Sequence, residues 1–289
     1  MSLPPDRDEC IEQAYFFRLF RERLVQNIPA QDILGRAHEE LLSTTKLPMA
    51  VQFLAAEIRH AGLLGPGFAR LSHYFTPFQA FLIKMAEDED RKFGLPVALL
   101  VLEREATFKA KNLTPQGLFV FHFETVARNK LGYDEGLKAS AGDPCFDENW
   151  KHYIGLVSRS VGTFDFCDLV YVRSQLYVDD QRRNHPDYEP PVQPIFGLKE
   201  GKIAKASFGR DPLFLFAALQ RQLDYPEVPK PKVRDDLEGT IFRLEAKVRE
   251  MEARLRIVEA EQRGTFDPTQ FGKPEIFRDI KDDEPPKAS

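Results

Sequence analysis

The chain has 289 residues, of which 43% are hydrophobic and 29% are charged, and its formal net charge is -5. This length and balance are sufficient for a large hydrophobic core and are typical of a soluble globular protein. Because the negative charge offers no general attraction to nucleic acid or to anionic lipid, neither nucleic acid nor a membrane is expected as a partner.

Cysteine usage and the start of the chain indicate a compartment. Cys10, Cys145 and Cys167 are far apart and form no Cys-x-x-Cys pair. A sparse, odd set of cysteines is typical of reduced thiols and predicts a cytoplasmic protein. The first ten residues are polar and contain proline, so no secretory signal is expected. The sequence contains no run of about 18 apolar residues, so no transmembrane segment is expected.

The first part of the chain has the pattern of successive helices. Apolar residues recur at helical spacing over residues 8–27, and proline ends that pattern. Further helices are predicted at 30–42 and 48–64, before a stretch that contains glycine and proline. Thr76-Pro77 and Thr114-Pro115 mark two more starts, since threonine caps free N–H groups and proline fits the first helical position.

The middle of the chain continues the helical pattern. Asp147 begins a predicted helix that Gly162 ends, and another is predicted over 164–179, where residues 169–172 could also form a strand. Asp211-Pro212 begins one more helix. Alternating strand patterns with Asn-Gly or Asp-Gly turns are absent from the sequence, so the fold class is predicted to be predominantly α.

Changes in composition divide the chain into four predicted parts. A multi-helix domain is expected over residues 1–180. A Pro-rich connecting segment or strap follows at 181–234, with a short helix at 211–224. A coiled-coil helix is predicted at 235–263, and a polar, flexible, disordered tail at 264–289.

The sharpest pattern is a 4-3 alternation of apolar residues within the predicted C-terminal helix. This 3.5-residue period is typical of coiled coils, which pack one narrow seam of each helix against a partner helix. With Ile241, Val248 and Leu255 at the a positions of the heptad, two of the three a residues are β-branched, and three of the four d residues are Leu or Met; this mix favours a parallel two-stranded coil. The seam consists of Leu237, Ile241, Leu244, Val248, Met251, Leu255 and Val258.

Charges beside the seam predict a homodimer. In a parallel, in-register pair, Lys247 would face Glu252 and Arg254 would face Glu259 of the other chain. Three heptads are marginal alone, and Gly239 weakens the helix further. Two alternatives stay open: an arm that folds back on its own domain, and pairing with a different protein partner.

One spacing is compatible with a metal ion. Glu57 and His60 are three positions apart on a predicted helix and could ligate one ion from the same face. Di-iron helical bundles need two such pairs, whereas this chain has one, and both residues could instead be polar edges of an amphipathic helix. Further carboxylates could come from Glu12 or Glu22, and from Glu103 or Glu105.

Other patterns give no catalytic assignment. The three cysteines lack a catalytic signature, and no Gly-x-Ser-x-Gly motif occurs. A basic stretch is interpreted as a solvated loop that could also meet an acidic partner; it contains Lys199, Lys202, Lys205 and Arg210. Aromatic clusters are interpreted as core, or alternatively as the wall of an apolar pocket.

The sequence therefore favours a non-enzymatic, oligomeric scaffold or adaptor protein without a cofactor, which self-associates through its C-terminal coiled coil. Two alternatives belong to other classes. One is a metal-dependent helical-bundle enzyme that uses Glu57 and His60, and the other is an apolar-ligand binder built on the Phe-rich helices.

Overall fold

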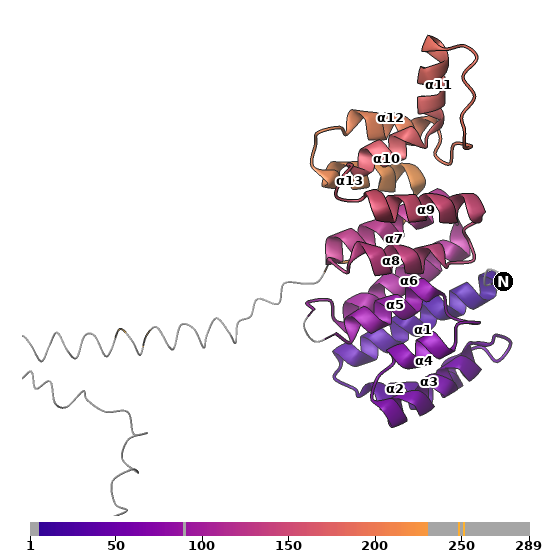
Figure 1. The fold of residues 1–289 in the computed structure, drawn as a ribbon. Coiled ribbons are helices and arrows are strands. Elements are labelled where there is room, and N and C mark those ends of the chain that lie inside the picture. Colours follow the sequence, from indigo (N-terminus) through magenta and orange to yellow (C-terminus); the bar gives the residue numbers. More distant parts are fainter. Residues whose placement is uncertain (1–5, 89–90, 231–247, 249–250, 252–289) are drawn as a thin grey trace, which may run out of the picture. The chain divides into compact units, whose positions relative to one another are not determined.

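A computed structural model describes residues 6–88 and 91–230, together with Val248 and Met251. Within these residues there are thirteen α-helices and two isolated β-bridges (Figure 1). The predicted predominantly α fold class is therefore confirmed for the described part of the chain. Among the same residues, no helix is both long and apolar enough to cross a bilayer.

The helix bounds are α1 Arg7–Val25, α2 Ala30–Glu40, α3 Leu47–Ala61, α4 Gly65–Arg70, α5 Pro77–Ala86, α6 Leu95–Lys111, α7 Pro115–Asn129, α8 Tyr133–Ala141, α9 Glu148–Ser160, α10 Phe166–Val172, α11 Gln175–Asn184, α12 Leu198–Ala206 and α13 Pro212–Leu223.

The chain divides into two units, Met1–Pro231 and Lys232–Ser289. In the second unit, Val248 and Met251 are helical, and their side chains are 45% and 50% exposed. The other predicted seam residues and the four charged residues beside them lie outside the described residues, as does the predicted tail at 264–289.

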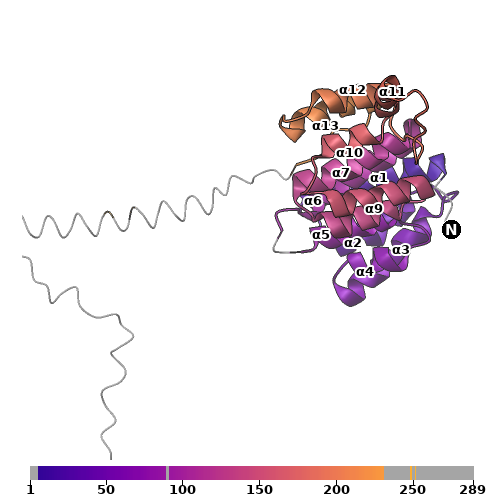
Figure 2. The same ribbon diagram turned by 45° about the horizontal axis from the view of Figure 1, so that its top comes forward.

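Helices in the first unit stack in approximate chain order, from α2–α4 at one end to α10–α13 at the other (Figures 1 and 2). The pairing of α1 with α6 departs from this order and packs the start of the chain against its middle. Most phenylalanines in the described residues are buried, including the predicted clusters around Phe16, Phe78 and Phe121. These aromatic clusters form part of one continuous core.

Local chemistry explains four of the predicted helix starts, which the structure confirms. The Thr76 hydroxyl accepts a hydrogen bond from the backbone N–H of Gln79. The side-chain oxygen of Gln79 in turn accepts the backbone N–H of Thr76, which completes a capping box. Thr114, Asp147 and Asp211 each accept a backbone N–H bond at the first turn of α7, α9 and α13.

The prediction of one continuous helix over 164–179 is wrong, because the helix is interrupted between α10 and α11. Ser174 forms a bridge with Phe196, and the N–H of Gln175 donates to the Phe196 carbonyl. The Ser174 hydroxyl also caps α11. A tertiary contact with a distant segment therefore ends α10, and residues 169–172 are helical rather than a strand.

Two helices, α12 and α13, lie within the predicted connecting segment 181–234. The interpretation of the basic stretch as a loop is wrong for Lys199, Lys202 and Lys205, which lie on α12, whereas Arg210 follows this helix. The small buried residues Gly201 and Ala204 let α12 approach its neighbours closely. A Cβ atom on Gly201 would lie 2.4 Å from Ser174 Oγ.

The segment after α13 packs along α7. The hydroxyl of buried Tyr225 lies 2.6 Å from Glu124 Oε2 and 3.1 Å from the carbonyl oxygen of Phe216. Asn129 Nδ2 donates to the carbonyl oxygen of Pro229 at 3.2 Å. These bonds hold the chain to the helical core up to the boundary between the two units.

Candidate functional site

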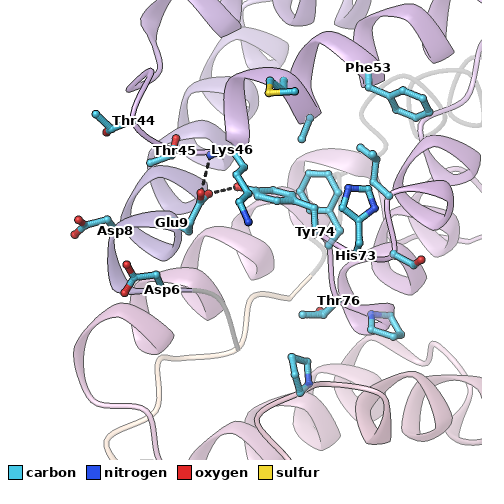
Figure 3. Close-up of a pocket in the computed structure, with 17 residues that line it drawn as sticks. Asp6, Asp8, Glu9, Thr44, Thr45, Lys46, Phe53, His73, Tyr74 and Thr76 are labelled. Atoms are coloured by element: carbon cyan, nitrogen blue, oxygen red, sulfur yellow. Dashed lines mark hydrogen bonds between the residues drawn. The ribbon is translucent and has the colours of Figure 1, made fainter. Parts of the chain in front are cut away.

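A pocket of about 1360 Å³ opens between the start of α1, the start of α3 and the connection from α4 to α5 (Figure 3). Its apolar lining consists of Met49, Ala50, Phe53, Leu71, Phe75, Pro77 and Pro144. Its polar lining consists of Asp6, Asp8, Glu9, Thr44, Thr45, Lys46, Ser72, His73, Tyr74 and Thr76.

Glu9 holds the three walls of this pocket together. One carboxylate oxygen accepts the backbone N–H of Lys46 at 2.6 Å, and the other accepts the hydroxyl of Tyr74 at 2.7 Å (Figure 3). Burial, followed by the bond to Glu9, raises the pKa of Tyr74, so this hydroxyl remains a donor at neutral pH. The pocket is therefore a built feature whose walls are tied by hydrogen bonds.

The apolar wall is accessible to a ligand. Met49 is 75% exposed, and Phe53 is half-buried beside it on the next turn of α3. The rings of Phe75 and Tyr74 meet edge to face at 4.9 Å and stiffen the opposite wall. A ligand with apolar side chains could cover this surface and remove it from water.

Charge is distributed unevenly along the pocket. Asp6, Asp8 and Glu9 lie toward one end, and Phe53 and His73 lie toward the other (Figure 3). Asp6 caps α1 through the N–H of the next residue, while Asp8 is exposed in the first helical turn. Lys46 lies beside Glu9 at the same end, where three carboxylates outnumber its one ammonium (Figure 3). The lining therefore combines an apolar surface with an end of net negative charge.

A second polar cluster lies fully buried between α6, α7 and the segment after α8. The Lys109 ammonium lies 2.7 Å from Glu105 Oε1 and 2.6 Å from Asp143 Oδ2. His122 Nε2 lies 3.1 Å from the same Glu105 oxygen, and His122 Nδ1 lies 2.9 Å from Ser140 Oγ. Charged groups this deep in a core must compensate one another.

Electrostatics keep this cluster ionised. Burial alone would raise the pKa of Glu105 and of Asp143, but Lys109 and His122 outweigh it and hold both values below their usual range. Burial would lower the pKa of Lys109, but Asp143 and Glu105 outweigh it and raise that value. The cluster is thus one ammonium between two carboxylates at neutral pH.

The cluster resembles two kinds of catalytic site in geometry but lacks what either requires. Ligand atoms of Glu105, His122 and Asp143 lie within 4.8 Å of one another, as for a metal ion, yet the Lys109 ammonium occupies the cation position between the carboxylates. Ser140, His122 and Glu105 follow the order of a nucleophile, base and acid, but Ser140 is fully buried within α8 and cannot meet a substrate. We assign a structural role to this buried cluster.

A further group of ligand-type residues lies at the start of α10, where Asp165, Cys167 and Asp168 come close together. Burial raises the pKa of the Cys167 thiol, which disfavours the thiolate that metals bind. Acidic residues in a first helical turn stabilise the helix dipole. This group is explained by helix formation.

The predicted metal pair lies on α3. Glu57 binds Arg70, with 2.8 and 2.7 Å between its two carboxylate oxygens and Arg70 Nη1, and His60 is exposed. Neither residue belongs to the ligand clusters in the described part of the chain. The assignment of a metal to this pair stays a prediction. Of the other carboxylates, Glu105 joins the buried cluster and Glu103 binds Arg21 at 2.9 Å.

Sequence reasoning missed both the pocket and the full membership of the buried cluster. Two signals were present: Glu105 and Lys109 have the i, i+4 spacing of a helical ion pair, and His122 interrupts an apolar run. The pocket had no such signal, because its walls come from three separate segments.

The candidate site is an open surface pocket on an all-α domain. The chain matches no protein-family model, and no curated protein or solved structure is significantly similar to it.

Proposed function

We propose that this protein is a non-enzymatic, cytoplasmic adaptor that binds a segment of a partner protein in the pocket between α1, α3 and α5, and self-associates through its C-terminal coiled coil. The observation that carries the proposal is the pocket itself, which combines an accessible apolar wall with an acidic end. The three cysteines form no disulfide with one another, which supports the reducing compartment.

Charge and shape define the partner segment. Asp6 and Asp8 favour lysine or arginine at one end of the segment, and Met49 and Phe53 favour apolar side chains beside them. The pocket exceeds the 300–1,000 Å³ that is usual for small ligands, and its exposed walls would leave a small ligand in contact with water. An extended peptide fits these properties better than a small apolar ligand does.

The second part of the proposal rests on the seam residues. Val248 and Met251 are helical and about half exposed in the single chain, so apolar surface remains for a partner helix. The opposite charges at Lys247 and Glu252 favour the parallel homodimer over other pairings. A dimer would present two pockets, which increases avidity for partners with repeated segments.

A peptide library tests the pocket. We expect the full chain to select peptides with two or more apolar residues beside Lys or Arg, and a synthetic peptide of that kind to bind in fluorescence polarisation. Met49→Glu places a charge on the apolar wall and should weaken binding at least tenfold. Asp8→Lys should weaken binding of the basic peptide and spare a peptide in which the cations are replaced by glutamine.

The matched control is Val25→Glu, which places the same charge on an exposed apolar residue at the far end of α1. This position is roughly 25 Å from Asp8 at about 1.5 Å per helical residue, so peptide binding should not change. Selection of peptides without apolar residues, or equal loss of binding in both glutamate variants, would refute the assignment of the pocket.

Light scattering after size exclusion tests self-association. The full chain is expected at twice its mass of 33.2 kDa, and a chain ending at Pro231 is expected at its monomer mass. Leu244→Asp should separate the dimer because it places charge in the seam, whereas Ala253→Asp on the outer helix face should not. A full chain that is monomeric at high micromolar concentration would remove the coiled coil from the proposal.

A further inference from the structure

The connection between α12 and α13 exposes large apolar side chains. All seven residues from 208 to 214 are exposed. Phe208, Leu213 and Phe214 are 42%, 47% and 68% exposed. Leu213 and Phe214 lie in the first turn of α13, which buries Leu215 and Phe216 in the core. Single exposed apolar residues are common, but three within seven residues form a patch that indicates an interaction.

The turn that joins α12 to α13 lies at the outer edge of the first unit (Figures 1 and 2). Phe208 contacts the ring of Tyr171 edge to face, which supports one side of the turn. The first turn of α13 directs Leu213 and Phe214 away from the core that Phe216 enters. The apolar side chains are therefore exposed along a short turn.

Basic residues precede this turn along α12, and one lies within it. Lys199 and Lys202 are exposed on α12, and Arg210 is exposed between Phe208 and Leu213. Lys205 lies 2.7 Å from Asp180. The acidic residue within the turn is Asp211, whose carboxylate accepts the N–H of Leu213 and caps α13. The segment from 198 to 214 contains four basic and two acidic residues, so its charge is positive, although the chain as a whole carries -5.

We propose that the turn from 208 to 214 is a membrane-docking tip for anionic bilayers. Phe208, Leu213 and Phe214 would enter the interfacial layer, where aromatic and apolar side chains are favourable. Lys199, Lys202 and Arg210 would lie against anionic headgroups. Association of this kind needs no transmembrane helix, because the side chains lie in the interface and do not span the bilayer.

A membrane-docking tip is separate from the adaptor pocket, and it differs from the expectation drawn from net charge. Electrostatic attraction at physiological salt acts over about 8 Å, so a bilayer senses the charge of the tip and not that of the whole chain. An exposed apolar turn with cations on the preceding helix fits a fluid surface better than a protein groove, which would need a fixed complementary shape.

Vesicle sedimentation with the full chain tests the tip. We expect binding to phosphatidylcholine vesicles that contain phosphatidylserine, half-saturated at roughly 0.1–1 mM lipid, in the range of a single myristoyl anchor. Binding should fall in high salt and be weak on phosphatidylcholine alone. The paired substitution Leu213→Ser and Phe214→Ser should weaken it at least tenfold, and circular dichroism should be unchanged because both side chains are exposed.

Matched controls separate the tip from general surface effects. Val25→Ser changes a 66% exposed apolar residue on α1 and should bind vesicles normally. Lys199→Glu and Lys202→Glu should each weaken binding about fivefold or more, by the contribution of one basic residue near an anionic surface. Lys138→Glu, at an exposed position on α8, should have no such effect.

The outcomes are distinct from those of the adaptor proposal. Met49→Glu should lose peptide binding and keep vesicle binding, and the Leu213 and Phe214 variant should show the reverse. The membrane proposal is overturned if the full chain does not sediment with phosphatidylserine vesicles at millimolar lipid. It is equally overturned if Val25→Ser reduces binding as much as the tip variant does, or if the tip variant binds normally.

Discussion

Replacing Lys109 with methionine is the most informative change in the core. Methionine has a similar volume, and the Lys109 side chain is 3% exposed, so packing should be nearly preserved while the ammonium is lost. Glu105 and Asp143 would then be two buried carboxylates without their cation. The experiment thus isolates the charge of one atom in the core.

The expected cost follows from the geometry. Removing one partner of a buried ion pair costs about 3–5 kcal/mol, and the upper end applies because Lys109 serves two carboxylates. A loss of about 4 kcal/mol lowers the midpoint of thermal unfolding by roughly 8–16 °C for a domain of this size. The control Lys84→Met removes the exposed pair with Glu135 and should cost less than about 1 kcal/mol.

The pH dependence distinguishes charge from packing. In the native cluster the pKa values of Glu105 and Asp143 are lowered, so their contribution to stability is present above their usual pKa and lost as pH falls through the lowered values. Without Lys109, burial would raise both pKa values. Protonation of Glu105 and Asp143 would then remove the uncompensated charges of the variant. The difference in unfolding free energy between the native protein and the variant should therefore be largest at pH 7 and shrink toward pH 4–5.

Urea unfolding of both proteins across pH 4 to 8 measures these differences. A loss below about 1 kcal/mol at pH 7 would contradict a buried ion cluster at this site. A loss that is equal at every pH would indicate a packing defect. Adding Asp143→Asn to Lys109→Met should cost less than the sum of the single changes, because it removes one of the uncompensated charges.

Three further predictions concern packing, hydrogen bonding and reactivity. Gly201→Ala should destabilise by about 1–3 kcal/mol because its methyl group overlaps the neighbouring helix, whereas Gly155→Ala, which meets no atom within 4 Å, should stabilise by about 0.5–1 kcal/mol; urea midpoints check both. Tyr225→Phe should cost about 1–3 kcal/mol, since the buried carboxylate of Glu124 loses one of its two donors and keeps only Arg128, and an unchanged midpoint would contradict the anchoring of this segment. Burial raises the pKa of the Cys10 thiol to about 11, so iodoacetamide should modify Cys10 more slowly at pH 8 in the native protein than in urea, as mass spectrometry would detect; equal rates would refute its burial.

The helix starts could be predicted from the sequence because their chemistry is local. Thr76 and Thr114 precede proline and bond to N–H groups within the same turn, so four adjacent residues contain the whole signal. The predominance of helix followed from apolar periodicity in the same way. The break at Ser174 could not be predicted, since it depends on Phe196, a residue that is distant in the chain.

The sequence by itself therefore determined the class of fold, the starts of the capped helices and the apolar surfaces that must be buried. Tertiary structure alone decided the sites. The pocket requires Glu9 to meet Lys46 and Tyr74, and the buried cluster requires α6 and α7 to bring Lys109 beside Asp143. The physical reason is range: caps and periodicity act within a turn or along one helix, whereas these contacts join residues up to 65 positions apart.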